Sequence, residues 1–118
     1  MKSVLLFLAQ GFEEYEASVF TDVMGWSRVY GTEPVNLITT GLRKELKCTW
    51  NMVVKPELEF DKINLQDYDA LAIPGGFEEY GFYEDAYQEE FLGLIRKFHK
   101  KKKNMSIKMT LLAILSNI

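Results

Sequence analysis

The sequence predicts an α/β protein whose sheet is mostly parallel. Residues 4–8 and 70–73 are continuously apolar instead of alternating, which is typical of parallel strands that helices cover on both faces. Segments with apolar residues at helical spacing follow these strands, at 15–30 and 83–102. Strands that alternate with helices predict a layered fold of helices, sheet and helices.

The first half of the chain is expected to hold one long helix and several strands. The first strand ends before Gln10, and the helix over 15–30 carries Phe20, Val23 and Met24 at helical spacing. We expect this helix to be largely buried. Three short segments that follow it are expected to be strand-like: 35–39, 46–48 and 52–54.

The second half is expected to hold a central strand and a second long helix. A short helical turn is expected at 63–65, before the strand at 70–73. The helix over 83–102 has one apolar face, which carries Phe91, Leu92, Ile95 and Phe98. Residues 105–115 are apolar with mixed propensity, and we assign them no element.

Length and composition favour one globular domain over residues 1–118. The chain is 47% hydrophobic with a net charge of -3, which excludes a disordered protein. Cys48 is the one cysteine, which excludes a disulfide scaffold and suits the reducing cytoplasm. Since no apolar run reaches the roughly 18 residues of a membrane span, we expect no membrane association.

The basic charge is concentrated near one end of the second predicted helix. Seven bases and no acid lie between Arg96 and Lys108, and six acids with no base lie between Glu78 and Glu90. Lysines 100–103 would fit a nucleic-acid patch. We favour a helix whose charges match its macrodipole, because the segment is short, lacks interleaved aromatic residues and belongs to an acidic protein. We therefore expect no nucleic-acid partner.

Two segments leave strands at the edge where a parallel sheet binds ligands, namely 10–16 and 74–77. A glycine pair after a buried strand can turn backbone N–H groups toward an oxyanion, and a carboxylate opposite would complete a site. Taken alone, the glycines also suit a tight turn, and Glu13, Glu14 and Glu16 also suit the first turn of a helix. A phospho-acceptor receiver domain is rejected, because the end of the central strand holds Ile73 and Pro74 instead of an aspartate.

Residues 4–16 (VLLFLAQGFEEYE) and 68–76 (YDALAIPGG) resemble the ThiJ/PfpI superfamily, and the resemblance covers about residues 2–107. The superfamily contains the human parkinsonism-associated protein and proteins described as thiazole monophosphate biosynthesis enzymes, intracellular proteases, glyoxalases or deglycases. It implies a flavodoxin-like three-layer sandwich, akin to class I glutamine amidotransferases.

The resemblance also implies a site. Members use a cysteine nucleophile on carbonyl or amide substrates in hydrolase, amidase, glyoxalase or deglycase chemistry. Glu16 matches the carboxylate that contacts the cysteine, and Gly75 and Gly76 match the glycines that supply oxyanion N–H groups. The resemblance further suggests a homodimer or larger assembly through the first helix, with Phe20, Met24 and Trp26 as contacts.

This chain departs from the family at the nucleophile. Lys108 stands at the cysteine position and Thr110 at that of a glycine, and the family's further strands and its histidine are expected to be missing. Cys48 is expected to lie away from the two segments that leave the strands. We therefore expect a fold incomplete at its C-terminal end and no cysteine chemistry, with no metal or other cofactor. The alternative is a non-catalytic binding or chaperone-like module that keeps the pocket.

Overall fold

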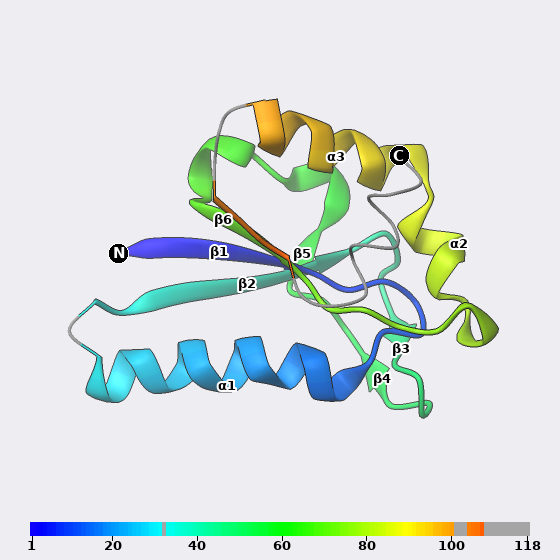
Figure 1. Cartoon of the computed structure of the whole chain (residues 1–118), viewed down its shortest axis with the longest axis horizontal. Coiled ribbons are helices and arrows are strands. Elements are labelled where there is room, and N and C mark those ends of the chain that lie inside the picture. The colour runs from blue at the N-terminus through cyan, green and yellow to red at the C-terminus, as the bar shows by residue number, and fades with distance from the viewer. Residues whose placement is uncertain (32, 101–103, 108–118) are drawn as a thin grey trace.

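A five-stranded parallel sheet forms the centre of the computed structural model, which describes residues 1–31, 33–100 and 104–107 (Figure 1). In spatial order its strands are β5 (Leu58–Glu59), β2 (Val35–Gly41), β1 (Lys2–Phe7), β6 (Ala70–Ile73) and β7 (Asn104–Ile107). Every neighbouring pair is parallel, with Leu5 opposite Ile38 on one side and Leu71 on the other. The chain passes from β1 to β2 on one side and later to β6 on the other. This reversal creates a switch point at the carboxyl end of β1.

Helices cover both faces of the sheet, which confirms the predicted α/β sandwich (Figure 1). One face carries α1 (Glu14–Tyr30), and the other carries α2 (Phe82–Ala86) and α3 (Glu89–Lys100). Three short 3₁₀ turns complete the described helices: η1 (Phe60–Lys62), η2 (Leu65–Asp67) and η3 (Glu78–Tyr80).

The packing of β1 explains why its residues 4–7 are all apolar. Val4 and Leu6 pack with Phe20 on the α1 side, whereas Leu5 and Phe7 pack on the α3 side. The rings of Phe7 and Phe91 stack there with centroids 3.8 Å apart. Both faces of the strand are therefore closed to water at residues 4–7.

The two strand-like pieces at 46–48 and 52–54 form a separate hairpin. Strands β3 (Leu46–Lys47) and β4 (Val53–Val54) pair antiparallel, joined by a turn in which Asn51 has φ 71°. The hairpin lies beside the start of α1, near the carboxyl end of β1 (Figure 1).

Two expectations about helices were wrong. The first helix is not largely buried: of its side chains only Ala17 and Phe20 are, and Trp26 is 53% exposed. The helix expected over 83–102 is divided into α2 and α3 at Tyr87 and Gln88.

The described part of the chain contains no helix long and apolar enough to cross a bilayer.

Candidate functional site

The carboxyl ends of β1 and β6 are joined by backbone contacts. The Glu13 N–H donates to the Gly75 carbonyl oxygen at 2.7 Å, and Phe12 pairs with Gly76 in an antiparallel bridge. In return the Gly75 N–H donates to Oε1 of Glu16 at 3.2 Å. A partly buried carboxylate and the glycine pair therefore lie together at the switch point, where a parallel sheet is best placed to receive a ligand.

The β3–β4 hairpin closes this junction from a third direction. The Gly11 N–H donates to the Lys47 carbonyl oxygen at 2.7 Å, and the Thr49 N–H donates to that of Phe12 at 2.9 Å. The buried Thr49 hydroxyl lies 3.0 and 3.1 Å from the carbonyl oxygens of Gly11 and Phe12. Three segments distant in sequence are thus tied into one unit, which we call the rim junction (residues 10–16, 46–49 and 75–76).

Two glycines let these segments approach so closely. Gly11 has φ +73°, and a Cβ there would meet the Tyr80 carbonyl. A Cβ on Gly76 would meet both the Phe82 ring and the Gly11 carbonyl oxygen. Larger residues at these positions would separate the segments.

Cys48 belongs to the rim junction, so the expectation that it lies away from both segments was wrong. It pairs with Phe12 in a parallel bridge, and its Sγ lies 3.9 Å from Oε2 of Glu14. The Met52 N–H lies 3.3 Å from the same sulfur, and the residue is 2% exposed. Cys48 lies here because the β3–β4 hairpin folds back against residue 12. The thiol is nevertheless closed off from solvent, as in a packing cysteine.

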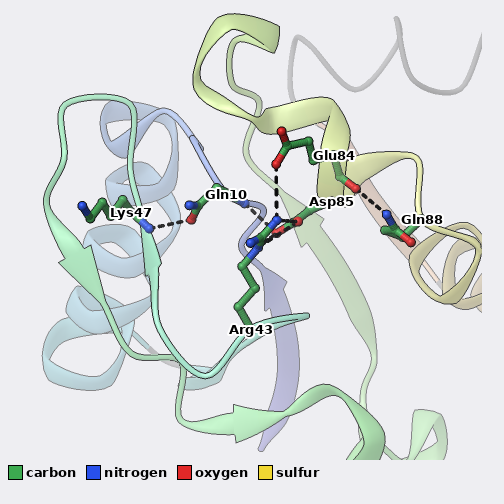
Figure 2. Close-up of polar contacts among 6 residues, drawn as sticks. All are labelled: Gln10, Arg43, Lys47, Glu84, Asp85 and Gln88. Carbon is green, nitrogen blue, oxygen red and sulfur yellow. Dashed lines mark hydrogen bonds and ion pairs between the residues drawn. The ribbon is translucent and has the colours of Figure 1, made fainter.

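A buried carboxylate braces the rim junction from the α2 side (Figure 2). Asp85 is 2% exposed, and its Oδ2 accepts a hydrogen bond from the Gln10 N–H at 2.9 Å. Its Oδ1 accepts hydrogen bonds from Nη2 of Arg43 at 2.8 Å and from Nε of Arg43 at 3.0 Å. The Gln10 side chain continues the chain of contacts by accepting the Lys47 N–H at 2.8 Å. Asp85 therefore joins the exits of β1 and β2 to α2.

Arg43 supplies the charge that makes this burial tolerable. Its hydrogen bond to Asp85 is the main reason that the pKa of the guanidinium is raised, with the charges of Asp85 and Glu84 adding to it and burial opposing it. Its side chain stays 41% exposed, so water reaches one side of the pair. The guanidinium holds the Asp85 carboxylate with several hydrogen bonds, a geometry that lysine would not reproduce.

A cavity of about 720 Å³ lies beside this ion pair and does not reach Glu16 or Gly75. Apolar residues such as Leu42, Leu58 and Phe60 line it together with charged ones of both signs, including Lys44 and Glu90. Among the described residues no group of three histidine, cysteine, aspartate or glutamate side chains could hold a metal ion.

The residues assigned to the site from the sequence are only partly brought together. Glu16, Gly75 and Gly76 meet at the rim junction, although their chemical roles stay predictions. Lys108 lies outside the residues that the structure describes. Arg43 and Asp85 were not singled out from the sequence. The one signal for Asp85 was its helical spacing, three positions after Phe82 and next to Ala86, which places it on the apolar face of this short helix, whereas Glu84 faces solvent.

A sequence model of the DJ-1/PfpI family matches residues 2–107. Drosophila melanogaster DJ-1beta has a TM-score of 0.79 at 20% identity, over 98% of this chain and 59% of that one. A DJ-1 superfamily protein from Agrobacterium tumefaciens has a TM-score of 0.75 at 22% identity, over 98% of this chain and 57% of that one. An AraC family transcriptional regulator from Pseudomonas putida has a TM-score of 0.77 at 13% identity, over 100% of this chain and 71% of that one.

At these identities the likenesses show the fold alone. The chain spans 57–59% of the length of the two DJ-1 proteins. No curated protein sequence matches it. Since the family match extends over residues 2–107 of the 118, this chain belongs to the DJ-1/PfpI family.

Proposed function

We propose that this chain keeps the carboxylate and glycine part of the DJ-1/PfpI site and does not itself perform the cysteine chemistry of the family. The observation that carries the proposal is the hydrogen bond from the Gly75 N–H to Glu16, which lies at the switch point of the sheet. The resemblance assigns the nucleophile position to Lys108. The one thiol in the sequence, Cys48, is buried, and buried thiols that pack among apolar groups are usually inert.

The ligand that suits this part of a site is a small carbonyl or amide compound. A ligand carbonyl oxygen would accept the Gly75 N–H in place of Oε1 of Glu16, and the displaced carboxylate would accept from a ligand amide. Without a thiolate, such a compound would be bound and released unchanged. A cytoplasmic location is part of the proposal, because a single unpaired cysteine suits a reducing compartment.

Consumption of methylglyoxal, a small carbonyl compound, tests the proposal. We expect the purified wild-type chain, Glu16→Gln and Cys48→Ser to consume it no faster than buffer does. Iodoacetamide is expected to alkylate Cys48 slowly in the folded protein and rapidly in urea. Turnover by the wild type that Glu16→Gln abolishes would contradict the proposal, because it would make Glu16 part of a working catalytic site.

A non-catalytic binding module is the second candidate, and helix α1 favours it. Val23, Trp26, Val29 and Tyr30 are between 53% and 80% exposed, although all four are large and apolar. Exposed apolar residues that form one contiguous patch are typical of interaction sites. We propose that its partner is a second copy of the chain, forming a homodimer.

A further inference from the structure

Three exposed aromatic rings meet next to the rim junction. The ring centroids of Trp50 and Tyr80 are 5.6 Å apart at 57°, and those of Phe77 and Tyr80 are 6.5 Å apart at 75°. The three residues are 66%, 48% and 43% exposed for Trp50, Phe77 and Tyr80. The rings do not stack flat on one another, and each keeps a large exposed surface.

Backbone hydrogen bonds fix the two loops that carry the rings. Trp50 lies in the hairpin turn, which the Cys48 N–H closes onto the Met52 carbonyl oxygen at 3.0 Å. Phe77 and Tyr80 are joined by the Tyr80 N–H, which donates to the Phe77 carbonyl oxygen at 3.1 Å. Because both loops adjoin the rim junction and are internally hydrogen-bonded, little backbone entropy would be lost on binding.

Acidic residues accompany two of the three rings. Exposed Glu78 and Glu79 lie between Phe77 and Tyr80 in sequence, and residues 75–81 contain no base, while the nearest base to Trp50 in the hairpin is Lys47, three positions before it. The open face of an aromatic ring carries a negative quadrupole, which attracts a cation, most strongly for tryptophan and tyrosine. Ring faces and carboxylates here favour the same sign of ligand.

We propose that Trp50, Phe77 and Tyr80 form a binding surface for a cationic alkylammonium group. Binding would come from the ring faces, with Glu78 and Glu79 adding long-range attraction. A neutral apolar ligand would gain the contact area without the electrostatic part. The surface does not depend on the proposed function, because it uses neither Glu16 nor the glycine pair.

Choline and its neutral isostere 3,3-dimethyl-1-butanol separate these two contributions. In a Trp26→Phe background the fluorescence of Trp50 reports binding alone, since Trp26 is the other tryptophan in the sequence. We expect choline to change the Trp50 emission saturably at millimolar concentrations, and the neutral isostere to bind at least about fivefold more weakly.

Substitutions then locate the surface. Tyr80→Ala is expected to weaken choline binding about fivefold or more, whereas Tyr30→Ala, which removes an exposed tyrosine from α1, leaves it unchanged. Glu78→Gln with Glu79→Gln is expected to weaken choline binding and not that of the isostere. Equal affinity for both compounds would overturn the proposal in favour of a plain apolar contact surface. The absence of any saturable change, or equal effects of Tyr80→Ala and Tyr30→Ala, would also overturn it.

Discussion

Asp85 is a buried carboxylate whose charge is balanced by a single half-exposed arginine. Removing Arg43 would leave the carboxylate with the Gln10 N–H and without its cation. We expect Arg43→Ala to lower the free energy of unfolding by about 2–3 kcal/mol, less than for a fully buried pair because Arg43 is 41% exposed. Urea unfolding of wild type and variant measures this difference.

Arg96→Ala is the matched control for that experiment. Arg96 pairs with Glu89 at 3.1 Å, but the two side chains are 51% and 77% exposed. Exposed pairs contribute at most about 1 kcal/mol. Equal losses from Arg43→Ala and Arg96→Ala would show that the Asp85 pair does not brace the rim junction.

The buried phenol of Tyr68 is expected to make the stability of the folded protein fall at alkaline pH. It is 7% exposed, and burial is the main cause of its raised pKa, with the charges of Asp67 and Glu57 adding to it. Below about pH 10 the phenol is neutral in both folded and unfolded chains; above it the unfolded chain ionises first, so stability falls. We expect Tyr68→Phe to keep its ring packing and to lose less stability above pH 10, as measured by thermal unfolding from pH 8 to 10.5. Parallel declines in both proteins would contradict this.

Sequence reasoning placed some site residues and missed others for a physical reason. The segments that carry Glu16 and Gly75 leave two predicted strands at the same edge of a parallel sheet, and the family resemblance selected Glu16 among the three glutamates there. Asp85 meets Gln10, 75 positions away, and Arg43, 42 positions away, and no local pattern encodes such contacts. The expected position of Cys48 was wrong because the sequence predicted two strand-like segments but neither their pairing into a hairpin nor the contact of that hairpin with residue 12.

At the scale of elements, the break between α2 and α3 explains why one predicted helix became two. The buried residues Phe82 and Ala86 in α2 correspond to Phe91 and Ile95 in α3, nine positions later in each case. Nine residues are about two and a half helical turns, so a continuous helix would point these two sets in opposite directions. The interruption at Tyr87 and Gln88 turns both sets toward the same core. The nine-residue spacing between the two apolar sets is the sequence feature that indicates two helices instead of one.

Glycines inside elements and at the rim junction should respond oppositely to alanine. A Cβ added to Gly93 in α3 meets nothing within 4 Å, so Gly93→Ala is expected to stabilise the protein by about 0.5–1 kcal/mol through helix propensity. Gly76→Ala is expected to destabilise it by about 1–3 kcal/mol, because the new methyl group overlaps the Phe82 ring and the Gly11 carbonyl oxygen. Denaturant unfolding measures both, and a stabilising Gly76→Ala would contradict the close approach of the rim segments.

At the scale of the whole molecule, the helices on the two faces of the sheet differ in how much of their apolar surface is buried. Phe91, Leu92, Leu94, Ile95 and Phe98 of α3 are all buried. Helix α1 buries Ala17 and Phe20 against the sheet and presents a second apolar stripe outward: Tyr15, Val19, Val23, Trp26 and Tyr30. The sequence predicted a buried helix because it is apolar on both sides. The fold covers one side only, which is what an interface with another chain requires.

This outward stripe leads to a prediction about assembly. Its members recur every three or four residues along a helix about 25 Å long, so two antiparallel copies could pack ridge against groove. We expect the wild type to sediment at micromolar concentration as a dimer of 13.7 kDa subunits. Trp26→Glu, which places a charge within the stripe, is expected to give monomers.

Trp50→Glu is the matched control, because Trp50 is also exposed but lies on the hairpin, and that variant should remain dimeric. A monomeric wild type would remove α1 as an interface, and dissociation by Trp50→Glu alone would move the interface to the aromatic rings beside the rim junction.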